Sequence, residues 1–261
     1  MRTVLSIAGS DCSGGAGIQA DLKTITVHKL YGMSVITALT AQNTTGVSGI
    51  YEVAPEFVGQ QLDMVFNDIY PDAIKIGMVA NPLITQVIAD KLIEYKARNI
   101  VLDPVMVSTS GSRLLKEEAV RVLLQRLFPL ADVITPNLSE AEVLSQISIV
   151  TKDDMERAAR RIGESYAGNI LIKGGHLEDR SDDLLYTGEG AYWFMQEHID
   201  NPNTHGTGCT LSSAIACNLA LGKSVRDSIS AAKDYITGAL KAELDMGKGR
   251  GPLNHCWNLS A

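Results

Sequence analysis

The sequence predicts an α/β fold with a mainly parallel central sheet flanked by helices on both faces, an α/β/α sandwich. Short β-branched runs alternate along the chain with longer amphipathic segments, which is typical of right-handed βαβ units. The 261 residues, 45% apolar and 20% charged, are enough for one large domain with a full core. Because the sequence has no low-complexity linker or internal repeat, we expect a single domain over residues 1–261.

The expected elements follow one another in a regular order. Buried strands, each a short run rich in Val, Ile and Leu, are predicted at 3–8, 34–39, 73–79, 99–105, 132–137 and 169–175. Helical periodicity between them predicts helices at roughly 17–30, 55–69, 82–97, 116–127, 139–145 and 151–166. A late β-hairpin is predicted where 183–187 and 191–199 flank a Gly-Glu-Gly turn, followed by two helices at about 207–221 and 224–243.

Charge and cysteine content exclude several classes of protein. Lys and Arg number 23 against 30 for Asp and Glu, a net charge of −7, which argues against a nucleic-acid partner. No apolar run approaches the roughly 20 residues that span a bilayer, and the N-terminus lacks the features of a signal peptide. The four cysteines show neither C-x-x-C pairing nor metal-site spacing. We therefore expect a cytoplasmic protein that acts on small molecules.

Polar and glycine-rich stretches follow the predicted strands and indicate where a ligand binds. In an open parallel sheet, ligands bind beyond the carboxyl ends of the strands. The stretches at those ends are AGSDCSGGAG, ALTAQNTTG, KIGMVAN, LDPVMVSTSG, TPNLSE and KGGH. Several such loops meeting at one edge of the sheet predict a single large site.

Two glycine motifs resemble nucleotide-binding loops but lack essential parts. Residues 15–20, GAGIQA, match the dinucleotide pattern G-x-G-x-x-G/A. That pattern also needs an acidic residue about 20 positions later, and none occurs between Asp21 and Glu52. Residues 221–224, LGKS, resemble the end of a P-loop, but Cys217 stands where its first glycine belongs.

The stretch HGTGC at 205–209 is better suited to an anion. Glycines at 206 and 208 let backbone N–H groups point inward, and the helix that begins there adds its positive dipole end. Such a loop favours phosphoryl transfer, although a plain helix start is the alternative. A thiol at a helix N-terminus can have a lowered pKa, so Cys209 is a candidate base or nucleophile, or else a packing residue.

Motifs along nearly the whole chain, from about residue 3 to 255, resemble the hydroxymethylpyrimidine kinase/phosphomethylpyrimidine kinase family of thiamine biosynthesis. They are GSDCSGGAGIQADLKT, ALTAQNTTGV, KIGMV, LDPVMV, TPNLSEAE, IKGGH and NTHGTGCTLSSAIA. The resemblance implies a ribokinase-like fold, a homodimer and ATP-dependent phosphorylation of 4-amino-5-hydroxymethyl-2-methylpyrimidine, first to the monophosphate and then to the diphosphate.

The resemblance also implies the catalytic residues. Cys209 would take the hydroxymethyl proton as the alcohol attacks the γ-phosphate, since a thiolate can serve as a general base. Gly206, Thr207 and Gly208 would form the anion loop. Lys173 would meet the transferring phosphate and would also lower the thiol pKa.

For the pyrimidine, the resemblance implies a reader, an acidic contact and apolar walls. Gln42 would read the ring edge, because a side-chain amide offers both a donor and an acceptor. Asp21 would contact the substrate through its carboxylate. The remaining contacts would come from Gly9, Met78 and Val107.

For the nucleotide, the family pattern N-x-x-E falls on Asn137 and Glu140. Glu140, with Asp103 as a second acidic member, would hold Mg²⁺ through water, since Mg²⁺ keeps several waters and takes few carboxylates directly. Thr204, Lys173 and Lys233 would lie on the ATP side. Each residue also has a structural alternative: Met78 as core, and Asp21 or Glu140 as acids that stabilise a helix start.

Other functions stay open on the sequence. A pyridoxal kinase of the same cysteine-bearing subgroup differs mainly at the strand end TAQNT, which fits the pyrimidine enzymes better. An NAD-dependent oxidoreductase and a non-catalytic binder are further alternatives, as is a cysteine hydrolase using His176 or His205. Cys12 departs from the Ser or Pro common in the family, and residues 108–115 are expected to form a lid.

Overall fold

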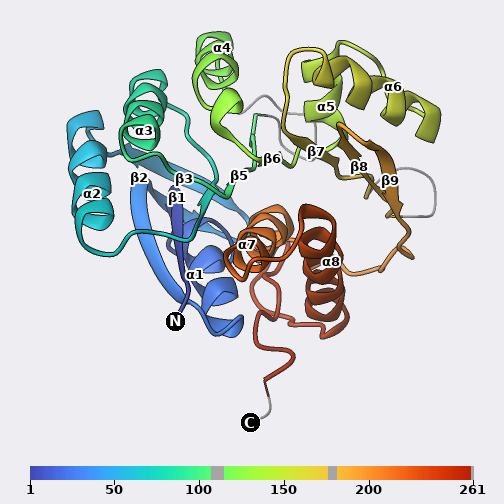
Figure 1. The fold of residues 1–261 in the computed structure, drawn as a ribbon. Helices are drawn as coiled ribbons and strands as arrows, with labels where there is room; N and C mark the ends of the chain where they lie inside the picture. Colours follow the sequence, from blue (N-terminus) through green and yellow to red (C-terminus); the bar gives the residue numbers. More distant parts are fainter. Residues whose placement is uncertain (107–114, 176–180, 260–261) are drawn as a thin grey trace.

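A nine-stranded sheet runs through the computed structural model, which describes residues 1–106, 115–175 and 181–259. The strand order is β3-β2-β1-β4-β5-β6-β7-β8-β9. Neighbours from β2 to β7 pair in parallel, and antiparallel pairs occur only towards the two edges of this described sheet. The predicted mainly parallel sheet is confirmed (Figure 1).

The predicted strands all form, most of them over fewer residues than expected. The strands are β1 (Thr3–Asp11), β2 (Tyr31–Asn43), β3 (Gly46–Glu52), β4 (Ala73–Ile76), β5 (Ile100–Leu102), β6 (Val133–Ile134), β7 (Asn169–Ile172), β8 (Asp183–Thr187) and β9 (Gly190–Phe194). Strand β3 is not among the predicted elements, because its seven residues are all exposed and show no alternation of burial. Its pairing with β2 makes it a strand.

The predicted helices are confirmed to within a few residues at each end. They are α1 (Gly17–Val27), α2 (Pro55–Asp68), α3 (Pro82–Glu94), α4 (Glu117–Arg126), α5 (Leu138–Ser145), α6 (Lys152–Gly163), α7 (Thr207–Ala220) and α8 (Val225–Lys241). Local signals set several starts: α2 and α3 begin with Pro, and the caps of α5 and α6 are full capping boxes.

Helices cover both faces of the sheet, as expected of an α/β/α sandwich. Ile25 and Val27 of α1 and the buried apolar residues of α7 and α8 belong to one apolar cluster, and most of those of α2 to α6 belong to a second cluster on the opposite face (Figure 1). Strand β4 shows how this geometry sorts side chains. Ile74 and Ile76 face the second cluster, so Lys75 between them points toward α1 and α7.

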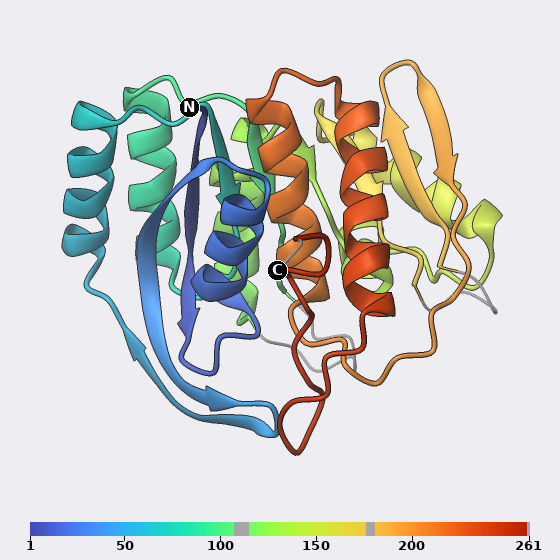
Figure 2. The same ribbon diagram turned by 90° about the horizontal axis from the view of Figure 1, so that it is seen from below.

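The β2–β3 hairpin extends away from the body of the sheet, and the chain after α8 runs beside its turn (Figure 2). Thr44 in that turn accepts hydrogen bonds from the backbone N–H groups of Lys248 and Gly249. Among the described residues, no helix combines the length and apolarity that would let it span a bilayer.

Candidate active site

The loop before α7 packs tightly against the loop before α1. Gly206 is the N-cap of α7 and has φ 84°, and a Cβ there would overlap the carbonyl oxygen of Gly15. Glycine is therefore required at 206, both for its left-handed backbone and for this close approach. A Cβ on Gly208 would lie 3.2 Å from Asp103 Oδ2 and 3.4 Å from Lys173 Nζ. The structure thus brings the predicted anion loop beside two of the predicted charged residues.

Lys173 and Asp103 form an ion pair at the carboxyl ends of β7 and β5. Their Nζ and Oδ1 atoms are 2.9 Å apart, with the side chains 18% and 5% exposed. Burial opposes the charge on Lys173, but the carboxylates of Asp103 and Glu140 outweigh it and raise the pKa of the ammonium. Lys173 is therefore a fixed cation that lies next to the anion loop and stays partly open to solvent.

Glu140 lies close to this pair but serves first as a helix cap. Asn137 and Glu140 form a capping box at the start of α5, with both reciprocal hydrogen bonds at 2.9 Å. The other carboxylate oxygen of Glu140 accepts the N–H of Met106 at 2.9 Å. Burial, aided by the charge of Asp103, raises the pKa of Glu140. The N-x-x-E pattern therefore has a structural role, and nucleotide and metal contacts remain predictions for it.

Cys209 is the third residue of α7 and is half-buried where two helices start. The backbone N–H of Gly17, the first residue of α1, acts to lower the pKa of its thiol. Burial nevertheless raises the pKa of the Cys209 thiol; the charge of Lys75 lowers it, and the carboxylates of Asp21 and Asp103 raise it further. The lowered pKa predicted from the helix N-terminus is therefore wrong, because burial outweighs the N–H groups.

The raised pKa predicts slow alkylation of Cys209. A thiol with a raised pKa is protonated near neutrality, and its reactive thiolate appears only as the pH rises toward that pKa. At about pH 8 we expect iodoacetamide to modify the exposed Cys12 at least tenfold faster than Cys209, with Cys209 still gaining reactivity as the pH is raised further. Peptide mass spectrometry of timed samples measures both rates in one tube, and equal rates would contradict the expectation.

The placement of Asp21 corrects a prediction. Its carboxylate is fully buried, pairs with Lys75 Nζ at 2.8 and 2.9 Å, and accepts the hydroxyls of Ser6 and Ser213. With these donors around it and no exposed surface, Asp21 does not offer a direct contact to a substrate. Lys75 is not among the predicted site residues, although a lysine inside the buried strand AIKIGM is a signal for one.

Gly9, Met78 and Gln42 lie at the ends of the strands at one side of the site. A Cβ on Gly9 would lie 3.5 Å from Met78 Cε, so glycine leaves room for that half-buried methionine. Gln42 exchanges hydrogen bonds through its backbone with the Cys12 sulfur. It lines an open groove of about 480 Å³ together with Cys12, Ala41, Asn43 and residues 45–48. Val107 and residues 108–114 of the expected lid lie outside the described residues.

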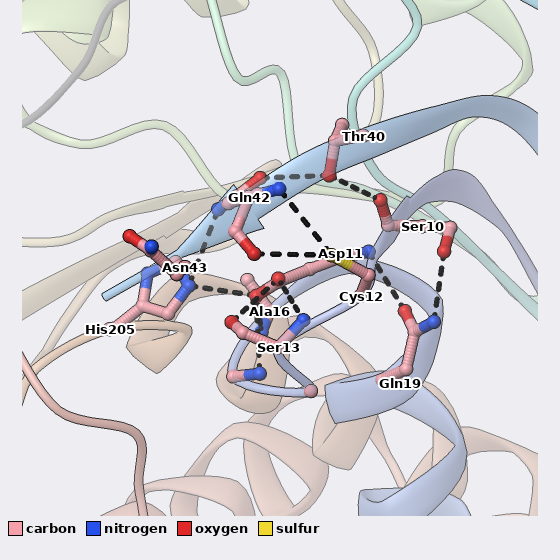
Figure 3. A network of polar contacts seen from close by, with 12 residues as sticks. Ser10, Asp11, Cys12, Ser13, Ala16, Gln19, Thr40, Gln42, Asn43 and His205 are labelled. Carbon is pink, nitrogen blue, oxygen red and sulfur yellow. Dashed lines mark hydrogen bonds and ion pairs between the residues drawn. The ribbon is translucent and has the colours of Figure 1, made fainter. Parts of the chain in front are cut away.

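His205 makes contacts other than with Cys209, the partner that a cysteine hydrolase would need. Its Nε2 atom lies 2.9 Å from Asp11 Oδ2 and 3.4 Å from the side chain of Gln42 (Figure 3). The sequence gives no sign of this group, because Asp11 and His205 are 194 positions apart. His176 lies outside the described residues.

The two remaining residues predicted to bind ATP are Lys233 and Thr204, and each makes contacts within the protein. Lys233 is buried, and its ammonium donates to Asp183 Oδ2 at 2.6 Å, so its charge is engaged within the protein. Thr204 is exposed, and its carbonyl accepts the hydroxyl of Thr207 at 2.8 Å. Contacts of either residue with a nucleotide remain predictions.

Comparison with known proteins identifies relatives over nearly the full length. The family model for phosphomethylpyrimidine kinase matches residues 11–254. The thiamine biosynthesis bifunctional protein ThiED of Geobacter sulfurreducens is 52% identical over 97% of this chain, which spans about half (52%) of that longer protein. The hydroxymethylpyrimidine/phosphomethylpyrimidine kinase of Rhizobium meliloti is 48% identical, with 96% of each chain covered.

Solved structures agree with the fold. A crystal structure of phosphomethylpyrimidine kinase from Clostridium difficile is 45% identical, with a TM-score of 0.83 over 91% of this chain and 98% of that one. An ADP complex of Bacillus subtilis pyridoxal kinase is 40% identical, with a TM-score of 0.91 and 98% of each chain covered.

Proposed function

The chain belongs to the phosphomethylpyrimidine kinase family, and from this premise we propose that it phosphorylates 4-amino-5-hydroxymethyl-2-methylpyrimidine and then its monophosphate. ATP is the proposed donor, and the diphosphate formed is a precursor of thiamine diphosphate. One observation supports this most: Cys209 and the Gly206–Gly208 loop lie beside Lys173 at the carboxyl ends of the strands. That cluster combines a proton acceptor with donors for a transferring phosphoryl group.

In the first phosphoryl transfer, Cys209, Lys173 and the Gly206–Gly208 loop have separate roles. Cys209, as the thiolate, takes the hydroxymethyl proton while the alcohol oxygen bonds to the γ-phosphorus and the bond to the ADP oxygen breaks. Lys173 and the N–H groups of the Gly206–Gly208 loop stabilise the charge on the moving phosphoryl oxygens. A thiolate of raised pKa is rare at neutral pH but is a strong base once formed.

The proposed Mg²⁺ would be held through water by Asp103 and Glu140. Both carboxylates are buried near Lys173 and accept donors from the protein, which fits an ion that keeps its own waters. In the described part of the chain, no three His, Cys, Asp or Glu side chains gather closely enough to form a direct metal site. The ion would neutralise charge on the nucleotide phosphates.

The second transfer needs less from Cys209. A phosphate monoester already carries an ionised oxygen at neutral pH, so no proton has to be removed from the attacking group. Lys173 and the anion loop would serve this step in the same way.

Product analysis tests the proposed function. The protein is incubated with Mg-ATP and hydroxymethylpyrimidine, and mass spectrometry follows the monophosphate and the diphosphate. Both products should form in sequence. A tenfold preference for pyridoxal over hydroxymethylpyrimidine would instead assign a pyridoxal kinase, the function named for the Bacillus subtilis structure.

Replacing Gln42 by alanine should raise the KM for hydroxymethylpyrimidine about tenfold, because two hydrogen bonds to the ring edge are lost. The KM for ATP should stay within about twofold, since Gln42 lies on β2, on the far side of β1 from the Lys173–Asp103 pair. Gln60→Ala, on the exposed side of α2, is the matched control. A weakened ATP site with normal pyrimidine binding would contradict this assignment.

The proposal also covers domain organisation, oligomeric state and cellular location. The chain acts as a single kinase domain, in keeping with a family match over residues 11–254. A homodimer is supported by the exposed apolar side chains of the β2–β3 hairpin, Leu39, Val47, Ile50 and Tyr51, and light scattering measures its mass. Four unpaired thiols support a cytoplasmic location.

A further inference from the structure

His205 joins three segments that are distant in the sequence (Figure 3). Asp11 ends β1, Gln42 lies near the end of β2, and His205 directly precedes the Gly206–Gly208 loop. The ring of His205 is held closely, because a Cβ on Gly15 would overlap its Cδ2 atom and its backbone N–H donates to Gly251 at 3.1 Å. Its contacts with Asp11 and Gln42 therefore follow from the way two loops pack.

Asp11 fixes the proton on His205. Asp11 is only 2% exposed, and its carboxylate accepts four donors from its own loop, the N–H and hydroxyl of Ser13 and the N–H groups of Gly15 and Ala16. Burial works to raise the pKa of Asp11, but these hydrogen bonds and His205 lower it below its ordinary value. An ionised carboxylate can only accept. The Nε2 atom of His205, 2.9 Å from Oδ2, therefore carries a proton and donates it.

This proton decides the orientation of the Gln42 amide. In the structure the amide nitrogen lies 3.4 Å from His205 Nε2, and the amide oxygen lies 3.2 Å from the hydroxyl of Thr40. Two N–H donors would then face each other. A half-turn of the amide removes the conflict, because Oε1 then shares the His205 Nε2 proton with Asp11 Oδ2 in a three-centre hydrogen bond, and the amide nitrogen donates to Thr40. The Thr40 hydroxyl itself donates to the carbonyl of Ser10 at 2.7 Å, so it is free to accept.

We propose that His205 is a positioning residue that sets pyrimidine specificity: directed by Asp11, it holds the Gln42 amide with Oε1 toward the imidazole and Nε2 toward Thr40. The proposal rests on the proposed function, in which Gln42 reads the ring. After these contacts, the Gln42 amide has one N–H donor and one oxygen lone pair left for a ligand. The donor is then fixed on the Thr40 side and the acceptor on the His205 side. A 4-aminopyrimidine presents an amino donor beside a ring-nitrogen acceptor, so one order of the amide matches that edge and the reverse order opposes it.

The first test needs no substrate. A long-range ¹H–¹⁵N NMR spectrum of the histidine-labelled protein reports which ring nitrogen of His205 carries the proton, with His205→Phe used for assignment. We expect Nε2 to be protonated. An unprotonated Nε2 would overturn the proposal whether or not the chain phosphorylates hydroxymethylpyrimidine.

The second test separates positioning from a general structural role. His205→Phe keeps a ring in place but removes the N–H, and it should raise the KM for hydroxymethylpyrimidine about tenfold while the turnover number and the KM for ATP change less than about threefold. His205→Gln, whose Nε2 has the same reach, should restore the KM to within about threefold. His198→Phe, at an exposed position, is the matched control.

A double-variant cycle completes the test. If His205 acts through Gln42, adding His205→Phe to Gln42→Ala raises the KM no further. Independent, multiplying effects would overturn the proposal, as would a normal KM in His205→Phe. A wild-type protein that leaves hydroxymethylpyrimidine unphosphorylated would refute the proposed function instead, and the NMR result would still decide the orientation of the imidazole.

Discussion

Replacing Cys209 by alanine should lower the turnover of hydroxymethylpyrimidine by about 100-fold or more, the effect of removing a general base. The KM values for both substrates should change much less, because alanine keeps the start of α7 and the loop N–H groups in place. Cys217→Ala is the matched control, since Cys217 lies on the same helix but is fully buried in the core. Near-normal turnover in Cys209→Ala would mean that the thiol is structural and that the anion loop acts alone.

The proposed role of Cys209 also predicts the direction in which turnover changes with pH. A base works only when unprotonated, and burial raises the pKa of the Cys209 thiol. Turnover of the first step should therefore rise with pH toward that raised pKa, and the rise should disappear in Cys209→Ala. Phosphorylation of the monophosphate should show a smaller loss, because that substrate brings its own ionised oxygen. Equal losses in both steps would argue against a role in proton transfer.

Most of the fold could be predicted because buried segments carry a strong periodic signal. Strands that are buried on both faces appear as runs of Val, Ile and Leu, and capped amphipathic helices lie between them. The exception is β3 (Gly46–Glu52), which is exposed throughout and is a strand only through its partner. The anion loop could also be predicted, since Gly206 and Gly208 are local requirements of the backbone and of close packing.

The parts of the site that depend on pairing could not be predicted. The family resemblance assigns Asp21 to the substrate, but nothing in the sequence shows that Lys75, 54 positions away, neutralises it. Cys209 looked like a low-pKa thiol because the helix start is visible in the sequence and the burial around it is not. Periodicity locates elements, but the partner of a charged side chain depends on how those elements pack.

Replacing Lys173 by methionine should lower turnover in both transfers by about 100- to 1,000-fold, as expected when a fixed cation that stabilises the transferring group is removed. The same change should lower the free energy of unfolding by about 3–5 kcal/mol, because it leaves the carboxylate of Asp103 buried without its cation. Steady-state kinetics and urea denaturation measure the two effects.

The double variant Lys173→Met/Asp103→Asn separates stability from catalysis. Replacing Asp103 by its neutral amide removes the unpaired charge, so most of the lost free energy of unfolding should return. Turnover should stay low, because no cation has been restored beside the Gly206–Gly208 loop. If turnover returned together with stability, Lys173 would be needed for folding of the site and the transferring phosphoryl group would be stabilised by other groups. Because Asp103 is also proposed to hold Mg²⁺ through water, the single variant Asp103→Asn is measured beside it. Turnover in a stable double variant that stays far below that of Asp103→Asn would assign the charge of Lys173 directly to the transfer step.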